Sequence, residues 1–308
     1  MTANLERRQI VKSHLLKDLY RNRVAYAYIS PFYILFIIFG AFPLVAGFYL
    51  SLHNWDGLSD MIFIGFGNYI NLFKDTVFLK AVYNTLFIGI IAHIPMLFGA
   101  LILAFIINMG IIKGKDIFRT VYFLPVITGS VAVAIVFRML YGVRAGLINY
   151  VLTLAHITPI DWWGGHGAWI KPAIIILFVW KWIGWNMVIY LAGMQGISND
   201  YYEAARIDGA NLPQMFFRIT LPLLKPIIFF TLIQSTIGGL TIFAEPYMLL
   251  EGSSGGTNYE GLTLMVFLYR DAFEYVHFGY ASAVAYVVSA FIIIISFFNM
   301  KFFGKENT

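Results

Sequence analysis

The chain has 308 residues, of which 60% are hydrophobic and 12% are charged, and its mean hydropathy is +0.76. A soluble domain of this length cannot bury so much apolar sequence in one core, so part of the surface must face lipid. The absence of cysteine excludes a disulfide framework, a thiolate metal site and a cysteine nucleophile.

Six apolar segments are long enough to cross a hydrocarbon core, which takes about 20 helical residues. In chain order they are residues 26–52, 83–109, 118–141, 172–194, 226–250 and 281–303. They predict an all-α membrane protein with six transmembrane helices and both termini on the same side. The first segment is too long for a signal peptide and no small-residue cleavage site follows it, so we expect it to remain as an anchor.

Basic residues gather on the side that holds the termini. The arm 1–25 contains Arg7, Arg8, Lys12, Lys17, Arg21 and Arg23, and the same side receives Lys113, Lys115, Arg119, Arg206, Arg218, Lys225, Lys301 and Lys305. The opposite side receives only Lys74, Lys80, Arg144, Lys171 and Arg270. By the positive-inside rule this asymmetry places the arm, the loop 195–225 and the tail 304–308 in the cytoplasm. The net charge of +5 then reflects topology, and no nucleic-acid partner is expected.

Between the fourth and fifth apolar segments the sequence predicts a helix, a turn and a second short helix outside the bilayer. Asp200 followed three residues later by Glu203 is a capping-box pattern, and Gly209 can end the helix in a left-handed conformation. Ala204 and Ala205 leave little bulk on one side, so a groove of another protein can approach the backbone closely. A capped surface helix without a partner is the alternative interpretation.

The spacing in this loop resembles that of a known family. Glu203-Ala204-Ala205, three residues, Gly209, nine residues, Ile219, one residue and Leu221-Pro222 match the cytoplasmic loop of permease subunits of binding-protein-dependent, ATP-driven (ABC) importers. The string from Tyr202 to Ala210 resembles the carbohydrate-uptake branch, and in particular the first of its two sugar permease subunits (maltose, glycerol-phosphate or multiple-sugar type). Segments 52–57, 66–69, 272–275 and 278–283 are similar to the same branch.

The resemblance implies a transport complex in the prokaryotic cell membrane, in which residues 26–303 form a multi-pass permease domain. The implied partners are a second, homologous permease subunit, two cytoplasmic ATPase subunits, an extracytoplasmic solute-binding protein, membrane lipid and a sugar or oligosaccharide substrate. ATP and Mg would be bound by the ATPase subunits, and no cofactor is expected in this chain. The residues implied to couple to the ATPase are Glu203, Ala204, Ala205, Asp208, Gly209, Leu221 and Pro222.

Polar residues within apolar spans are the candidates for a substrate path, because they are costly in lipid and usually face a cavity or another helix. Trp185, Asn186, Gln234 and Thr241 offer aromatic faces and hydrogen-bonding groups that suit a sugar. The alternative is that they bond helices together. The resemblance implies a substrate site between the fourth and fifth spans, where Gly184 and Gly238 would leave room.

Two ionisable residues, Lys181 and Glu245, lie deepest in the predicted spans. They can form an intramembrane pair, but the sequence leaves open whether they meet.

The segments predicted to be external are rich in aromatic residues. Residues 54–82 and 142–171 carry several Trp, Phe and Tyr residues, and an interfacial belt is favoured over ligand contact as their role. The segment 251–280 contains a Gly- and Ser-rich run, which predicts a flexible loop that can move against a docked partner.

No catalytic motif is present. The Gly114-Lys115 pair lacks the other residues of a phosphate-binding loop, the histidines lack zinc-site spacing, and no Gly-x-Ser-x-Gly sequence occurs. The sequence therefore predicts a non-catalytic subunit. Three alternatives remain: an importer permease for an amino acid, peptide or phosphate ester; an ion-coupled secondary transporter, which would need an internal repeat and a mid-membrane ion site; and an intramembrane enzyme.

Overall fold

The computed structural model describes residues 21–303, so most of the predicted cytoplasmic arm and the whole tail 304–308 lie outside it. The described chain is helical throughout, apart from loops and one short antiparallel pair of strands, β1 (His53–Asn54) and β2 (Ile62–Phe63). This confirms the predicted all-α membrane fold. Four helices are continuous enough to span a membrane, and the described residues hold six spans if two bent helix pairs each count as one.

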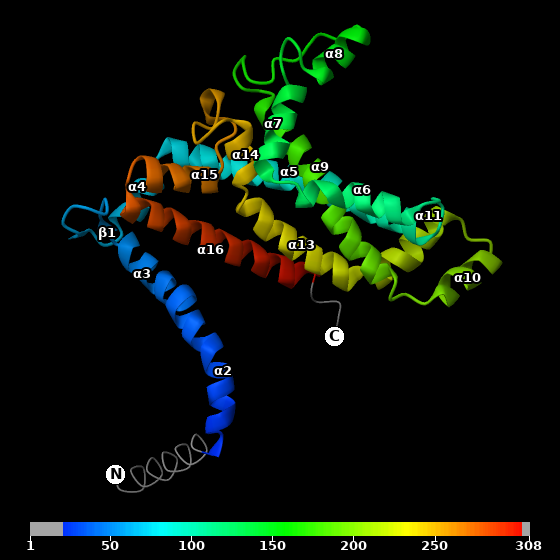
Figure 1. The fold of residues 1–308 in the computed structure, drawn as a ribbon, viewed down its shortest axis with the longest axis horizontal. Helices are drawn as coiled ribbons and strands as arrows, with labels where there is room; N and C mark the ends of the chain where they lie inside the picture. The colour runs from blue at the N-terminus through cyan, green and yellow to red at the C-terminus, as the bar shows by residue number, and fades with distance from the viewer. Residues whose placement is uncertain (1–20, 304–308) are drawn as a thin grey trace.

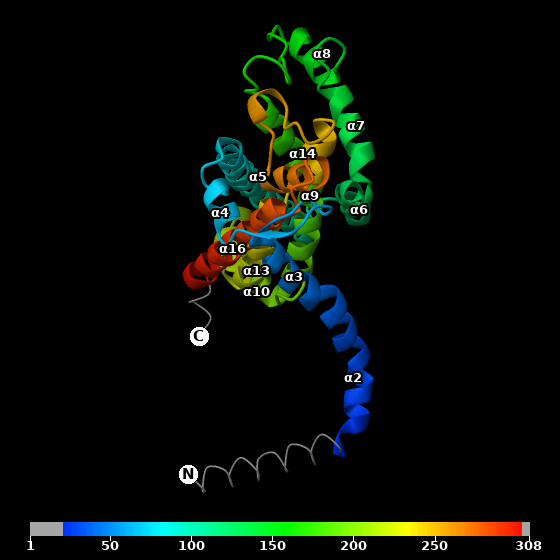
Figure 2. The same ribbon diagram turned by 90° about the vertical axis from the view of Figure 1, so that its left-hand side faces the viewer.

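The first span projects away from the helix bundle. It consists of α2 (Arg23–Phe36), the π-helical turn η1 (Ile37–Ala41) and α3 (Phe42–Ser51). Only its last part packs on the bundle, where α3 meets α16 (Phe278–Phe303), while α2 projects away (Figures 1 and 2). None of the α2 residues is buried, so its apolar side chains are left to lipid or to another protein.

The centre of the bundle is the long contact between α5 (Thr76–Asn108) and α9 (Ile170–Met194). Alanines 92, 100 and 104 of α5 are fully buried and let the two backbones approach. Helix α6 (Lys115–Ile127) packs on the other side of α9, at Gly184. A Cβ at Gly184 would clash with the carbonyl oxygen of Tyr122, so only glycine permits this crossing.

Two predicted spans are interrupted, which corrects the expectation of continuous helices. The third bends by 100° between α6 and α7 (Ser130–Leu140), where Thr128 and Gly129 adopt extended backbone conformations. The fifth begins with α13 (Lys225–Leu240), and residues 241–243 separate it from α14 (Ala244–Leu249). Broken helices are tolerated at membrane depth only where protein or a water-filled cavity satisfies the freed backbone groups.

The remaining elements lie at two opposite ends of the bundle (Figure 1). At one end are α10 (Asn199–Ile207), α11 (Leu212–Met215), η2 (Phe216–Thr220) and α12 (Leu221–Leu223). The other end carries the strands with α4 (Gly67–Leu72), α15 (Leu264–Tyr269) and η4 (Arg270–Glu274), while α8 (Leu147–Leu154) projects beyond α7 at the top of Figure 1. The short helix η3 (Thr257–Tyr259) lies in the loop between α14 and α15. The polar loop 195–225 is thus far from the aromatic segments, as the predicted topology requires.

Candidate functional site

A cavity of about 690 Å³ lies between the two helix breaks. One wall is the α6–α7 break, residues 126–130, and a second wall is the α13–α14 break, residues 241–245. Helices α5, α9 and α13 supply the remaining lining: His93, Met96, Phe178, Lys181, Trp182, Trp185, Asn186, Gln234, Ser235 and Gly238. The breaks missed by the sequence prediction therefore form the cavity walls.

Five of the six residues predicted for the substrate path line this cavity: Trp185, Asn186, Gln234, Gly238 and Thr241. The sixth, Gly184, lies outside the lining and serves the α6–α9 crossing described above. Gly238 does leave room, because a Cβ added there would meet no atom within 4 Å.

The two amides do not bond neighbouring helices. Asn186 donates from Nδ2 to the carbonyl oxygen of Trp182, 3.1 Å away on its own helix. Gln234 is exposed at the cavity and has no hydrogen bond to a described residue. The helix-bonding interpretation requires bonds between helices, and within residues 21–303 neither amide makes one.

The question left open by the sequence about Lys181 and Glu245 has a clear answer. Lys181 Nζ lies 3.0 Å from Glu245 Oε1 and 2.7 Å from the Oγ atom of Ser130. Trp182 also donates its indole N–H to Glu245 Oε1, at 3.2 Å. Lys181 is 4% exposed and Glu245 6% exposed. Buried charges need such partners, and this group joins α9 to the first turns of both α7 and α14.

At the far end of the bundle, the predicted capping box of α10 is wrong. Ser198, and not Asp200, caps the helix by accepting the N–H of Asp200, and Glu203 is exposed. Ser198 wins because it directly precedes the first helical residue. The true capping box is reciprocal between Asn211 and Gln214, with bonds of 2.8 and 2.9 Å, and the Asn-x-x-Gln spacing is its sequence signal.

The predicted left-handed end of α10 is confirmed, since Gly209 has φ +76°. The N–H of Ala210 reaches back to the carbonyl of Ala205 at 2.8 Å, as in a Schellman motif. Tyr202 is buried and its hydroxyl lies 2.9 Å from that of Thr220, which ties α10 to η2.

The other face of α10 is free of contacts with the bundle. Glu203, Ala204, Asp208 and Gly209 are exposed, and Ile207 is 87% exposed. Ile207 was not among the predicted coupling residues, although an apolar residue in a polar loop signals a contact surface. Ala205 and Leu221 are half-buried and Pro222 is exposed.

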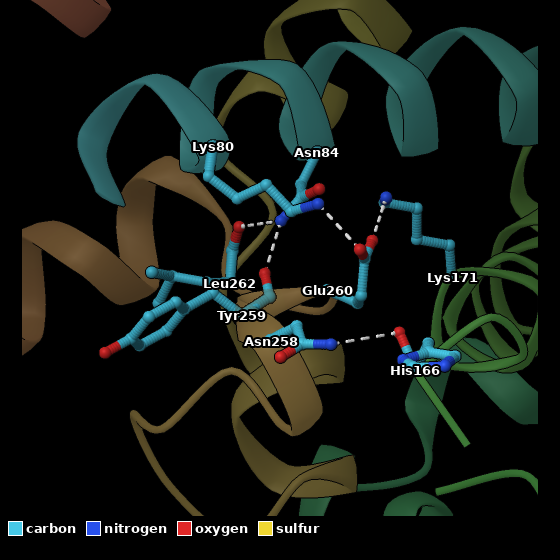
Figure 3. A network of polar contacts seen from close by, with 8 residues as sticks. All are labelled: Lys80, Asn84, His166, Lys171, Asn258, Tyr259, Glu260 and Leu262. Carbon is cyan, nitrogen blue, oxygen red and sulfur yellow. Dashed lines mark hydrogen bonds and ion pairs between the residues drawn. The ribbon is translucent and has the colours of Figure 1, made fainter. Parts of the chain in front are cut away.

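The loop after α14 is anchored to α5 and α9 by side-chain contacts, although its Gly- and Ser-rich composition predicts a flexible segment. Glu260 lies between Lys80 of α5, at 2.6 Å, and Lys171 of α9 (Figure 3). Asn84 donates to the carbonyls of Tyr259 and Leu262 at 2.6 and 3.0 Å. Within the Gly- and Ser-rich run, Gly255 serves close packing, because a Cβ there would clash with Leu262.

The electrostatics of this loop favour a charged carboxylate. Burial raises the pKa of Glu260, but the hydrogen bonds from Lys171 and Lys80 outweigh it and hold the pKa below its usual value. Residues 21–303 contain no group of three or more His, Asp or Glu side chains that could hold a metal ion.

Residues 96–304 match the protein family described as "Binding-protein-dependent transport system inner membrane component". The lactose transport system permease protein LacF of Rhizobium radiobacter is 36% identical over 271 residues, which cover 88% of this chain and 90% of that protein. The arabinooligosaccharides transport system permease protein AraP of Bacillus subtilis (strain 168) is 33% identical over 295 residues, covering 94% and 92%.

Two solved structures of transporter chains are similar to this fold. A chain of a bacterial ABC transporter involved in the import of the acidic polysaccharide alginate superposes with a TM-score of 0.80 and 25% identity, covering 96% of this chain and 100% of that one. A chain of the bacterial alginate ABC transporter in complex with an alginate pentasaccharide-bound periplasmic protein gives a TM-score of 0.76 and 26% identity, covering 92% and 95%.

Proposed function

Because this chain belongs to the family of inner-membrane components of binding-protein-dependent transport systems, we propose that it is the permease subunit of an ATP-driven importer for a sugar or oligosaccharide. The cavity between the two helix breaks carries this proposal. Its wall combines the indole ring of Trp185 with the amides of Asn186 and Gln234. Rings pack against the C–H faces of a sugar, and amides both donate to and accept from its hydroxyl groups.

The charge of the cavity favours a neutral sugar. Among the lining residues the only lysine, Lys181, and the only acidic residue, Glu245, are paired with each other. No arginine lines the cavity, so no uncompensated lysine or arginine is left in this wall to bind a substrate carboxylate. The same pairing speaks against an ion-coupled transporter, because Glu245 is occupied by Lys181.

We assign the exposed face of α10 to contact with a cytoplasmic ATPase subunit. The residues concerned are Glu203, Ala204, Asp208 and Gly209, with Ala205, Leu221 and Pro222 beside them. Closure of two ATPase subunits on ATP and Mg would carry α10 along, and the Tyr202–Thr220 contact would pass this movement to η2 and α13.

The remaining partners follow from the exposed surfaces. The uncovered apolar side of α2 fits a second, homologous permease subunit, because α3 alone packs on this chain's own bundle. The end that carries β1, α4 and α15 would face an extracytoplasmic solute-binding protein.

The test is ATPase stimulation of the complete complex in liposomes, with the binding protein and a panel of candidate solutes. We expect stimulation and uptake with a neutral mono- or oligosaccharide, and weaker responses to uronate-containing sugars. Stimulation by amino acids, peptides or phosphate esters alone would replace the sugar by another solute class. Uptake that follows an ion gradient and needs no ATP would overturn the proposal.

A further inference from the structure

A continuous series of aromatic rings runs from the cavity to the outer strand pair. It consists of Phe243, Tyr247, Tyr269, Phe273, Phe278 and Trp55, here called the aromatic track. Phe243 is itself part of the cavity wall. The ring centroids of neighbours lie 5.0, 5.2, 5.1, 6.3 and 6.0 Å apart in that order.

These rings lie at the edge of the hydrophobic core or outside it. Phe273 is 63% exposed, and the other five are half-buried. None of the six is a member of the three clusters of buried apolar residues, although Phe243 and Tyr247 pack against one of these clusters. Aromatic rings that keep one face accessible on a packed scaffold are available to a ligand.

Short, packed helices hold the rings in place. Phe243 and Tyr247 are one turn apart at the start of α14 and stack at an interplanar angle of 23°. Tyr269 ends α15 and Phe273 follows one turn later in η4. Trp55, which directly follows β1, contacts Phe278 at the start of α16.

We propose that the aromatic track guides sugar rings from the outer face of the protein into the cavity. This inference rests on the proposed sugar-import function and on the predicted topology, which places the strand pair outside. A sugar packs its C–H face on one ring and passes to the next without losing all contact, because neighbouring rings are at most 6.3 Å apart. The hydroxyls of Tyr247 and Tyr269 add donors and acceptors for sugar hydroxyls halfway along.

An interfacial belt, the role favoured from sequence, explains the track less well. Belt residues mark the level of the membrane surface around a protein. The track instead connects residues from several elements to the cavity wall. Its cavity end is a cluster in which Phe243 contacts both Tyr247 and Tyr269, with Phe243 and Tyr269 centroids 5.3 Å apart, and the other rings follow from Tyr269. It also mixes tyrosines with phenylalanines at its centre, where a sugar needs both surfaces.

The experiment uses the complete reconstituted complex and compares Tyr269→Ala, Phe273→Ala and Tyr269→Phe. The matched control is Phe66→Ala, which removes a ring of similar exposure, 64%, at the same end but outside the track. Uptake is measured over a range of sugar-loaded binding protein, with a short and a long oligosaccharide. Aromatic contacts of this kind correspond to roughly a 2- to 10-fold change in rate.

We expect Tyr269→Ala and Phe273→Ala to slow uptake by about that factor, more for the long than for the short oligosaccharide. Tyr269→Phe keeps the ring and loses only the hydroxyl, so its uptake should lie between that of Tyr269→Ala and the wild type, while Phe66→Ala should stay near the wild type. Affinity for the binding protein and recovery of the second permease subunit are measured on the same preparations. Unchanged uptake in both alanine variants would overturn the track. So would a loss explained by weaker binding of either protein, since the rings would then be a docking surface. A wild-type complex that moves no sugar would refute the proposed function together with the track.

Discussion

The cavity and the α10 loop are built in opposite ways. The cavity depends on contacts between residues far apart in sequence: Lys181 bonds Ser130, 51 residues before it, and Glu245, 64 residues after it. The α10 loop is organised by short-range caps, such as Ser198 with Asp200 and Asn211 with Gln214, and Tyr202 anchors it to η2. A region held locally can move as a unit, whereas a region held by distant residues changes shape when any one partner moves.

The largest effect is expected from breaking the buried pair in the cavity. Lys181→Met leaves Glu245 buried without its partner, which typically costs about 3–5 kcal/mol. We expect a lower unfolding temperature and a reduced yield of folded complex in detergent. The double variant Lys181→Met with Glu245→Gln should recover most of this loss. A single variant as stable as the wild type would show that the pair does not hold the cavity together.

Next in size is the loss of coupling at the α10 loop. Glu203→Lys reverses an exposed charge on the proposed ATPase contact, so transport should be abolished and the ATPase should co-purify poorly. Membrane insertion and unfolding temperature should stay unchanged, because Glu203 has no capping role. Asp116→Lys, the same charge reversal on the exposed start of α6, is the control. Wild-type uptake in the Glu203 variant would remove the coupling role.

Gly209 tests whether the end of α10 needs its left-handed conformation. Gly209→Val places a β-branched residue at φ +76°, which costs about 1–2 kcal/mol, and should reduce coupled ATP hydrolysis. Gly209→Asn should be milder, because Asn tolerates this conformation. An added Cβ meets no atom of this chain within 4 Å, so the effect is backbone strain unless the ATPase itself is close. Equal coupling in both variants and the wild type would contradict this expectation.

A smaller effect is expected within the cavity wall. Asn186→Ala or Gln234→Ala removes one substrate hydrogen bond each, typically about 0.5–1.5 kcal/mol, so uptake should fall several-fold at normal complex yield. ATPase activity with the binding protein should partly persist, because docking uses other surfaces. Normal yield with unchanged uptake and selectivity would exclude both residues from the path, and reduced yield would restore the helix-bonding interpretation.

The smallest effect concerns the loop held by Glu260. Its pKa is lowered in the folded protein, so its stabilising contribution is complete above the unfolded value, near 4.5, and is lost as the pH falls through the folded value. The protection of residues 252–263 from hydrogen exchange, measured relative to the intrinsic rate at each pH, should therefore be constant near neutral pH and fall only below about pH 4.5. Glu260→Gln should exchange faster at neutral pH and lose this acid dependence. An acid response retained in that variant would point to another group.

The sequence predicted most of what depends on local pattern. Apolar length gave the six helical segments, and the Glu-Ala-Ala spacing gave the α10 loop with its left-handed Gly209. The N-cap of α10 was predicted at Asp200 and lies at Ser198, because Ser198, Asn199 and Asp200 are all polar and only the backbone geometry decides which of them caps the helix. Asn186 and Gln234, which line the cavity, could be singled out because polar groups in apolar spans are conspicuous.

The features that could not be predicted from the sequence depend on contacts between residues far apart in the chain. The bend at Gly129 and the interruption at residues 241–243 both lie within mainly apolar segments. A hydropathy profile measures how apolar a segment is and therefore does not reveal where its helix breaks. Whether Lys181 meets Glu245 depends on how α9 packs against α14. The aromatic track and the Glu260 tie likewise join residues from several elements, so no window along the chain reveals them.

The Lys181–Glu245 pair also constrains how the chain is made. During synthesis Lys181 enters the membrane before Glu245 exists, and a lysine at the centre of a span costs about 2.5–3.5 kcal/mol on insertion scales. The apolar remainder of α9 must offset that cost. Ser130, synthesised earlier, can already accept a hydrogen bond from the ammonium group, and the carboxylate completes the site only when α14 arrives. The cavity is therefore completed only once α14 has been made, and biogenesis of this subunit has a built-in order.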